Sequence, residues 1–323
     1  MNFSGATILL TGGTGSFGQV FTRRLLAEWP DAVVRVYSRD ELKQLEMRER
    51  VGDEQVRYLI GDVRDRDRLY RAAQGVDFIV HAAAMKQVPA CEYNPFEAVQ
   101  TNVLGAQNVV DVAIDAGVKR VVALSTDKAV NPVNLYGATK LCAEKIVVQG
   151  NAYAARTTTR LACVRYGNVV GSRGSVVPLF RRQIERDGRL TITDERMTRF
   201  WISLDQAVDL VMHAFDHARG GEVFVPKIPS MRVVDLAEAM APGLPRDVIG
   251  IRPGEKLHEL LLTSDESRHA VDIGDLYVVL PEHPWWDHDV AYRDGKPLAD
   301  EFVYSSGTND EWLGVEELAA LLQ

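Results

Sequence analysis

The chain has 323 residues, of which 46% are apolar and 25% are charged, so it can bury one large core or two smaller ones. Its 37 basic and 45 acidic residues give a formal charge of −8 without a long run of either sign, which disfavours binding to nucleic acid or to an anionic membrane. No apolar run approaches the roughly 18 to 20 residues that cross a bilayer, and little sequence precedes the first apolar segment, so we expect a cytoplasmic protein.

Short apolar segments alternate with amphipathic ones in the first half of the chain. The apolar segments cover residues 6–12, 32–40, 56–62, 76–84 and 120–126, and a helical pattern at 17–29 follows the first of them. Apolar runs of this length are typical of parallel strands that helices cover on both faces. We therefore predict an α/β fold with a Rossmann-type doubly wound parallel sheet.

A glycine-rich turn joins the first predicted strand to the first predicted helix. In LLTGGTGSFGQVF, Gly12, Gly15 and Gly18 are three residues apart, which is a variant of the G-x-G-x-x-G spacing. Glycines here let the backbone approach a pyrophosphate, whose charge then meets the N-terminus of the helix. We predict that the turn binds a nicotinamide dinucleotide through Gly12, Thr14, Gly15, Ser16, Phe17 and Gly18.

The end of the second predicted strand bears on the choice of dinucleotide. It reads VYSRD, so Ser38 and Arg39 come first and Asp40 follows. Arginine and serine favour the 2′-phosphate of NADP, whereas a carboxylate would bind the adenosine ribose of NAD. We predict NADP, with NAD as the less favoured alternative because of Asp40.

The next strand ends supply further candidate contacts. Asp62 and Val63 are expected to bracket the adenine. The cofactor would then run past three small residues, Ala82, Ala83 and Ala84. Close packing between a helix and a strand explains these alanines equally well. Asn102 lies on a helix expected to face this strand and is included as a cofactor residue, although a mid-helix asparagine is more often a polar support.

The stretch LSTDKAVNPVNLYGATK, residues 124–140, carries the reactive groups. Tyr136 and Lys140 are four residues apart on a predicted helix and therefore share a face. A lysine ammonium beside a phenol lowers the phenol's pKa, so the tyrosine can take a proton from a sugar hydroxyl while a hydride leaves to the nicotinamide. Thr126 is preferred to Ser125 as the group that binds the same hydroxyl. With the glycine turn, this pattern indicates a dehydrogenase type of site.

The second half of the chain changes texture after Gly167, with more loop-like segments. The helical pattern at 204–221 is expected to pack back on the sheet before a further strand at 222–226. We therefore predict two interleaved parts. Residues 1–168 plus about 203–228 form the NADP-binding Rossmann domain, and residues 169–202 plus 229–323 form a smaller, sequence-interleaved C-terminal substrate-binding lobe.

Several motifs resemble the extended short-chain dehydrogenase/reductase family, among them TGGTGSFG, TDK and YGATK. Longer stretches are similar to the soluble, C5-inverting UDP-N-acetylglucosamine 4,6-dehydratases, which start the route to pseudaminic acid. These stretches include YSRDELKQ, HAAAMKQVPACEYNPFEAVQTNVLGAQNV, LSTDKAVNPVNLYGATK and IRPGEKLHE. The likeness runs from about residue 5 to about residue 320. It implies a lyase that acts on UDP-N-acetylglucosamine and assembles as a homo-oligomer, a dimer or a hexamer.

The resemblance also implies a reaction and two catalytic roles. The sugar would be oxidised at C4, lose water across C5 and C6, and receive the hydride at C6, giving UDP-2-acetamido-2,6-dideoxy-β-L-arabino-hexos-4-ulose. NADP would stay tightly bound and be recycled. Asp127 would act as the acid toward the C6 oxygen and Lys128 as the base at C5. Lys128 would then need a pKa lowered by burial or by the cationic nicotinamide.

Other interpretations of these residues stay open. A C5-retaining dehydratase and a 4-epimerase of a UDP-sugar would share the fold. An epimerase keeps Tyr136 and Lys140 but has no need of the Asp127–Lys128 pair. The pair could also be a plain ion pair at the end of a strand.

Six residues are candidates for binding the nucleotide sugar: Lys86, Asn168, Arg173, Arg199, Arg252 and Glu255. Arginines suit the diphosphate and a carboxylate suits the uridine ribose, so Arg252 and Glu255 are assigned to the UDP end. Arg199 has an alternative role in a structural ion pair. No metal site is predicted. No Glu, Cys or third His accompanies His213 and His217, and for His283 and His288, which flank two tryptophans, exposed packing of the tail is the favoured interpretation.

Overall fold

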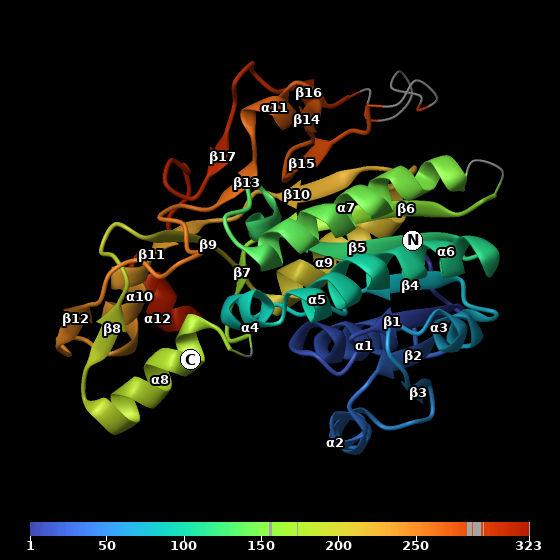
Figure 1. The fold of residues 1–323 in the computed structure, drawn as a ribbon, viewed down its shortest axis with the longest axis horizontal. Coiled ribbons are helices and arrows are strands. Elements are labelled where there is room, and N and C mark those ends of the chain that lie inside the picture. The colour runs from blue at the N-terminus through green and yellow to red at the C-terminus, as the bar shows by residue number, and fades with distance from the viewer. Residues whose placement is uncertain (155–156, 173, 283–285, 287–291, 293, 323) are drawn as a thin grey trace.

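A ten-stranded sheet forms the centre of the computed structural model, which describes residues 1–154, 157–172, 174–282, 286, 292 and 294–322 (Figure 1). Across the sheet the strands are β16 (Lys296–Pro297), β14 (Ala270–Asp272), β15 (Leu276–Val279), β10 (Val223–Pro226), β6 (Arg160–Tyr166), β5 (Arg120–Thr126), β4 (Phe78–His81), β1 (Thr7–Thr11), β2 (Val33–Ser38) and β3 (Val56–Ile60). The seven strands from β10 to β3 are parallel, and β15, β14 and β16 join antiparallel. This order confirms the predicted doubly wound sheet.

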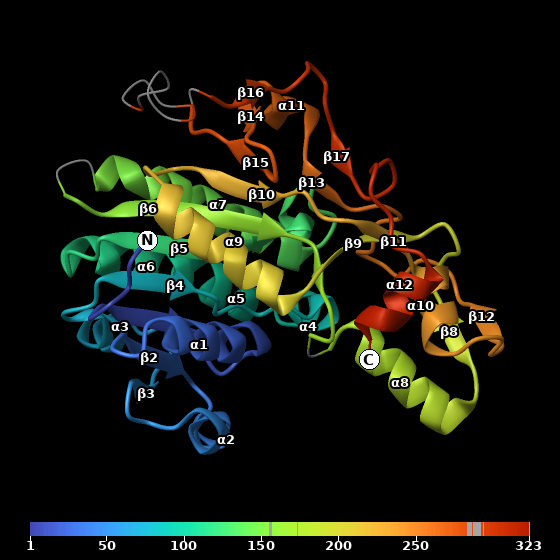
Figure 2. The same cartoon turned by 180° about the vertical axis from the view of Figure 1, so that it is seen from behind.

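Helices cover both faces of the sheet. On one face α3 (Arg66–Ala73), α6 (Gly105–Asp115) and α7 (Leu135–Tyr153) pack side by side (Figure 1). On the other face α1 (Ser16–Glu28) packs against α9 (Leu204–His217), as Figure 2 shows. A capping box of Ser203 and Gln206 starts α9, and the helix packs on β5 and β6, so the predicted return of the chain to the sheet is confirmed.

The interior strands are buried because they carry almost only apolar side chains. All four residues of β4 are buried, as are all residues of β6 except Arg160. Their side chains join those of the covering helices in one large hydrophobic core, whose burial is the main driving force for folding. The carboxyl ends of the parallel strands open at one edge of the sheet, which is where α/β proteins bind their ligands.

Short helices lie near this edge. Between β4 and α6 the chain forms α4 (Val88–Tyr93), α5 (Pro95–Ala98) and the π-helix η1 (Val99–Leu104). The 3₁₀ helix η2 (Asp127–Ala129) follows β5, and α2 (Glu41–Val51) lies beside β2 and β3.

None of the helices among the described residues is long and apolar enough to cross a membrane.

A smaller lobe is built around a second hydrophobic core, which includes Phe180, Trp201, Met231, Leu236 and Leu318. It lies beside the carboxyl ends of the parallel strands (Figure 1). Apart from α9, the described elements outside the central sheet that follow β6 are β7 (Asn168–Val169), α8 (Val176–Asp187), β8 (Leu190–Ile192), β9 (Thr198–Ile202), β11 (Ser230–Arg232), α10 (Val233–Met240), β12 (Arg246–Val248), β13 (Leu260–Leu262), α11 (Ser264–Ser267), β17 (Tyr304–Ser305) and α12 (Val315–Leu321). They form the small sheets β11–β9–β7, β12–β8 and β13–β17.

The chain passes between the central sheet and the lobe more than once. It leaves the sheet after β6, returns for α9 and β10, and leaves again at β11. The predicted division places all of 229–323 in the lobe, whereas β14, β15 and β16 extend the central sheet. The physical reason is that β10 would otherwise be an open edge of the sheet, and β15 pairs with it along its length.

Candidate active site

A cleft of about 650 Å³ lies at the carboxyl ends of the parallel strands. It extends from the glycine turn after β1, past the ends of β2, β4 and β5, to the segment between β6 and α8. Most of the residues assigned from the sequence line it: Gly12, Thr14, Gly15, Ser16, Phe17, Gly18, Ser38, Arg39, Asp62, Val63, Ala82, Ala83, Ala84, Lys86, Thr126, Lys128, Tyr136, Lys140 and Asn168. The structure therefore gathers residues from both ends of the predicted site into one cleft.

The glycine turn has the geometry of a phosphate-binding loop. Gly12 has φ +68°, and a Cβ there would lie 2.8 Å from the backbone nitrogen of Ala83. The turn can thus lie close to the chain after β4 only without a side chain at this position. Helix α1 begins at Ser16, so its unpaired amide groups and its positive dipole end point toward the cleft. These features fit the pyrophosphate of a dinucleotide.

The segment after β2 brings two cations, Arg39 and Lys43, to the other end of the cleft, and the tip of β3 brings the carboxylate of Asp62. Arg39 is 58% exposed and lies 3.6 Å from Asp62. Asp40 is the N-cap of α2, and its Oδ1 accepts a hydrogen bond from the backbone nitrogen of Lys43 at 3.0 Å. The Lys43 side chain forms an ion pair with the same carboxylate and also lines the cleft. Lys43 was not assigned from the sequence, although its place in the first turn after VYSRD was a usable signal.

Asn102 does not line the cleft, which corrects its assignment as a cofactor residue. Its Oδ1 accepts a hydrogen bond from the backbone nitrogen of Met85 at 2.8 Å. Its Nδ2 donates to the Met85 carbonyl at 2.9 Å and to the hydroxyl of Thr139 at 3.0 Å. The side chain is 1% exposed, so these bonds satisfy a buried amide and fix the segment between β4 and α4.

Thr126, Asp127 and Lys128 form a connected group where β5 ends. The hydroxyl of Thr126 donates to Asp127 Oδ1 at 2.8 Å, and Lys128 Nζ donates to the same oxygen at 3.0 Å. Lys128 also approaches Asn168 Oδ1 at 3.4 Å. Asp127 is fully buried, and its Oδ2 has no hydrogen-bond partner in the part of the chain that the structure describes. The pair is therefore not a surface ion pair.

The pKa of Lys128 is shifted in the direction opposite to the predicted one. Burial alone would lower this pKa, but the carboxylates of Asp127 and Glu259 outweigh burial and the repulsion from Arg199, so the pKa lies above its ordinary value. The side chain remains 26% exposed. The expectation that burial lowers the pKa of Lys128 is wrong for this state of the protein, in which the side chain is an ammonium.

Tyr136 and Lys140 lie in the same cleft, but the structure does not show the predicted lowering of the Tyr136 pKa by Lys140. Burial raises the pKa of Tyr136 to about 12, against the opposing effects of the Lys128 charge and of a hydrogen bond with Thr126. The ammonium of Lys140 donates to the carbonyl of Leu124 at 2.7 Å, and burial lowers the pKa of Lys140. The cation that favours the phenolate is thus Lys128, and without a ligand the phenol stays protonated at neutral pH.

Two charged residues that the sequence analysis did not assign stand behind this group. Glu259, which is 3% exposed, places Oε1 3.7 Å from Lys128 Nζ. Its Oε2 lies 3.6 Å from Lys256 Nζ, which donates to the carbonyl of Val130 at 2.6 Å. Both residues belong to IRPGEKLHE, three positions apart. That spacing was the available signal, but their burial beside Lys128 depends on the tertiary fold.

The remaining substrate candidates fall into three groups. Lys86 and Asn168 line the cleft. Arg199 does not, because it is 8% exposed, donates to the carbonyls of Thr198 and Leu257, and lies 3.8 Å from Glu259, as its alternative role in an ion pair requires. Arg252 and Glu255 lie outside the cleft lining, on a loop whose Gly254 carbonyl accepts a hydrogen bond from Asn134 at 2.8 Å. Arg173 lies outside the described residues.

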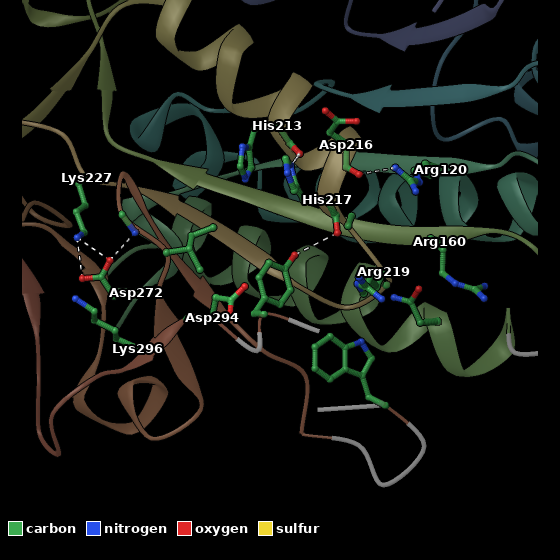
Figure 3. A pocket seen from close by; sticks show the side chains of 18 residues that line it. Arg120, Arg160, His213, Asp216, His217, Arg219, Lys227, Asp272, Asp294 and Lys296 are labelled. Atoms are coloured by element: carbon green, nitrogen blue, oxygen red, sulfur yellow. Dashed lines mark hydrogen bonds and ion pairs between the residues drawn. The ribbon is translucent and has the colours of Figure 1, made fainter. Parts of the chain in front are cut away.

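A second cavity, of about 1510 Å³, lies near the amino-terminal ends of β5 and β6 (Figure 3). His213 and His217 line it with their rings stacked, 4.0 Å between centroids. Across it Lys227 forms an ion pair with Asp272 at 2.8 Å (Figure 3). Within the described ranges no group of three or more His, Cys, Asp or Glu side chains is placed to hold a metal ion. His283 and His288 fall outside those ranges.

The chain has close relatives along its whole length. A protein from Campylobacter jejuni named UDP-N-acetylglucosamine 4,6-dehydratase (inverting) is 50% identical to it, over 99% of this chain and 98% of the relative. A protein from Rickettsia felis named UDP-glucose 4-epimerase is 42% identical, over 99% of this chain and 96% of the relative.

Solved structures share the fold. The X-ray structure of Pen from Bacillus thuringiensis matches with a TM-score of 0.91 and 41% identity, covering 99% of this chain and 98% of that one. A dTDP-glucose 4,6-dehydratase from Streptomyces venezuelae, solved with NAD bound, matches with a TM-score of 0.68 and 26% identity over 78% of this chain and 86% of that one. Residues 8–281 match the family described as polysaccharide biosynthesis protein. The chain belongs to this family, within the extended short-chain dehydrogenase/reductases.

Proposed function

We propose that the protein is a C5-inverting UDP-N-acetylglucosamine 4,6-dehydratase. The observation that carries the proposal is the pair of the buried Asp127 with the partly exposed Lys128, joined at 3.0 Å beside Tyr136 at the end of β5. An acid and a base in contact are what the loss of water from a 4-keto sugar requires. The name and 50% identity of the Campylobacter relative support the substrate and the stereochemistry.

The reaction needs proton transfers that these side chains can supply. A bound nicotinamide dinucleotide would accept a hydride from C4 and return it to C6. Tyr136, bonded to Thr126, takes the proton of the C4 hydroxyl as the phenolate, a form that the positive charges of Lys128 and of an oxidised nicotinamide would favour. Lys128 removes the C5 proton, which the C4 ketone has made acidic, and Asp127 gives a proton to the C6 oxygen so that water leaves. A proton from solvent added to the opposite face of C5 gives the L-arabino product, and Tyr136 returns the proton it took from C4 to solvent.

One proton transfer prepares both members of the pair. At rest Lys128 is an ammonium and Asp127 is a carboxylate, so neither is in its reactive form. Transfer of a proton from Nζ to Oδ1 along their hydrogen bond produces an amine and a carboxylic acid together, with no change in net charge. Elimination then returns the pair to its charged form, because the amine gains the C5 proton and the acid loses its own.

A 4-epimerase is the second candidate function, because the Rickettsia relative named UDP-glucose 4-epimerase is 42% identical over nearly the whole chain. Epimerisation needs a base at the C4 hydroxyl, and Tyr136 would serve. It needs neither an acid at C6 nor a base at C5, so it leaves the buried pair without a role. This difference favours dehydration.

Incubation with UDP-N-acetylglucosamine in D2O separates the two functions. We expect the NMR spectrum of the product to show a 6-methyl group, deuterium at C5 and the L-arabino configuration, and we expect Tyr136→Phe to form none of it. A C4 epimer that has kept its C6 oxygen would instead establish the epimerase. A 6-methyl product with its original C5 configuration would establish the C5-retaining dehydratase.

We also propose NADP rather than NAD as the cofactor. Arg39 and Lys43 line the adenosine end of the cleft, while the carboxylate of Asp40 is occupied by α2 and by Lys43. NAD remains the alternative cofactor, because the similar Streptomyces dehydratase was solved with NAD bound.

Arg39→Ala tests this preference. Loss of an exposed guanidinium that pairs with the 2′-phosphate is expected to weaken NADP binding by about tenfold and to change NAD binding much less. Calorimetric titration of the apoprotein with each dinucleotide measures both affinities, with Arg23→Ala on the outer side of α1 as the control. Equal weakening for both dinucleotides would contradict the proposal.

Three further assignments are proposals of the same kind. Arg252 and Glu255 bind the UDP end of the substrate after closure of their loop. The protein forms a homo-oligomer, a dimer or a hexamer, which the strong exposure of Tyr93 (88%) and Phe96 (80%) supports. The product enters the route to pseudaminic acid in the cytoplasm.

A further inference from the structure

Glu259 is the shared counterion of three cations behind the site. Its carboxylate lies 3.7 Å from Lys128 Nζ, 3.8 Å from Arg199 Nε and 3.6 Å from Lys256 Nζ. Each cation also donates a hydrogen bond to another acceptor: Lys128 to Asp127, Arg199 to backbone carbonyls and Lys256 to Val130. Glu259 Oε2 has no hydrogen-bond partner among the described residues. Its contribution to these three residues is therefore charge.

Glu259 supplies one of the two negative charges that face Lys128. The charged and titratable groups that face Lys128 are Asp127 on η2, Tyr136 on α7, Lys86 after β4, Arg199 on β9, and Lys256 and Glu259 before β13. Without Glu259, the positive charges of Lys86, Arg199 and Lys256 would surround Lys128 with Asp127 as the one opposing carboxylate. Such a field favours loss of the Lys128 proton.

We propose that Glu259 is a positioning residue that sets the proton affinity of Lys128 and thereby fixes how the Asp127–Lys128 pair holds its single proton. This inference rests on the proposed dehydration. The pair is active only when Asp127 and Lys128 together hold one proton. With no proton, Asp127 has none to donate, and with two protons, Lys128 cannot accept the C5 proton. Glu259 keeps the proton in the pair across the pH range in which the protein works, and Lys256 opposes it.

The direction of the effect follows from the charges. Lys128 in the native protein should lose its proton only above the ordinary range of lysine. Glu259→Gln removes a negative charge at 3.7 Å, so the midpoint of Lys128 titration is expected to fall by about one unit or more. Adding Lys256→Met to Glu259→Gln removes a repelling charge, so the midpoint should rise again. The high-pH limb of kcat/KM for dehydration should move in the same two directions.

NMR of holoprotein labelled with ¹³C-lysine provides the test. The Lys128 ¹³Cε resonance, identified by its absence in Lys128→Met, is titrated in the native protein, in Glu259→Gln and in the double variant. Glu259→Asp, which keeps the charge, is expected to retain the native midpoint. Glu222→Gln removes another fully buried carboxylate, one held by the backbone of Arg219 and Gly220, and should leave the Lys128 midpoint unchanged.

The outcomes separate this inference from the proposed function. An unchanged Lys128 midpoint in a folded Glu259→Gln protein would overturn the role of Glu259, even if the native enzyme dehydrates UDP-N-acetylglucosamine. Deprotonation of Lys128 well below its ordinary range in the native protein would overturn it too, without the need for a variant. Absence of dehydration by the native enzyme, with the titration shifts as expected, would refute the proposed function and leave the charge coupling established.

Discussion

Replacement of Lys128 with methionine is expected to slow water elimination by about 10²- to 10⁴-fold, the usual contribution of a positioned acid or base. The variant keeps the aliphatic stem but has no amine to take the C5 proton or to supply the proton of Asp127. The glycine turn is unchanged, so the cofactor should still bind, and C4 should still be oxidised, although more slowly because Tyr136 loses the Lys128 charge that favours its phenolate. In a single turnover with UDP-N-acetylglucosamine, the reduced nicotinamide absorbance should appear and persist while no 6-methyl product forms.

The control for this experiment is Lys145→Met, which removes an exposed lysine from α7. It should oxidise and dehydrate the substrate at the native rate. Normal turnover by Lys128→Met would show that the base at C5 is a different residue. Failure of the variant to reduce the nicotinamide would place Lys128 in the first step as well, where its charge favours the Tyr136 phenolate.

Replacement of Arg165 with methionine is expected to lower the free energy of unfolding by about 3 to 5 kcal/mol, the usual cost of breaking a buried ion pair from one side. Arg165 on β6 is 1% exposed and binds Glu144 on α7 and Glu266 on α11 through its guanidinium nitrogens. It also donates to the carbonyl of Leu261 at 2.9 Å. Without Arg165, the carboxylates of Glu144 and Glu266 have lost their shared cation between the sheet, α7 and the segment after β13. Denaturation by urea measures the change.

Two comparisons make this result specific. Arg268→Met breaks the exposed pair with Asp265 on the same short helix, and should change the stability by less than about 1 kcal/mol. Arg165→Met with Glu144→Gln should recover part of the loss, because one stranded charge is gone.

Although burial raises the pKa of Glu266, Arg165 holds this pKa below 4.5. This contribution exists above pH 4.5 and is lost as the pH falls, so native stability should decline on acidification more steeply than that of the variant. Equal stability of Arg165→Met and the native protein would contradict the role of the triad.

Local signals in the sequence were sufficient for much of the fold and the centre of the site. The parallel strands are runs of apolar residues, and the turn at Gly12 is encoded within a few positions. Thr126, Lys128, Tyr136 and Lys140 occur within one stretch of fifteen residues and all line the cleft. Their convergence could be inferred because a strand end and the following helix remain close in space.

Features that depend on distant contacts could not be inferred in the same way. Glu259 reaches Lys128 across more than a hundred positions, and its carboxylate adds to that of neighbouring Asp127 in raising the Lys128 pKa against the effect of burial. Arg199 has the charge of a phosphate ligand, but the packing of β9 buries it against Glu259. For Tyr136, spacing indicated a shared face with Lys140 but not that burial would dominate its pKa. In each case the deciding quantity is which charges are buried together.

The repeated passage of the chain between sheet and lobe has a consequence for how the protein is made. When the ribosome has produced β6, that strand is an unpaired edge, and its partner β10 lies beyond a long excursion through the lobe. The lobe in turn lacks Leu318, buried in its core on α12, until α12 has been made. Neither body can close as an independent unit during translation, so the nascent chain carries exposed apolar surface until α12 emerges.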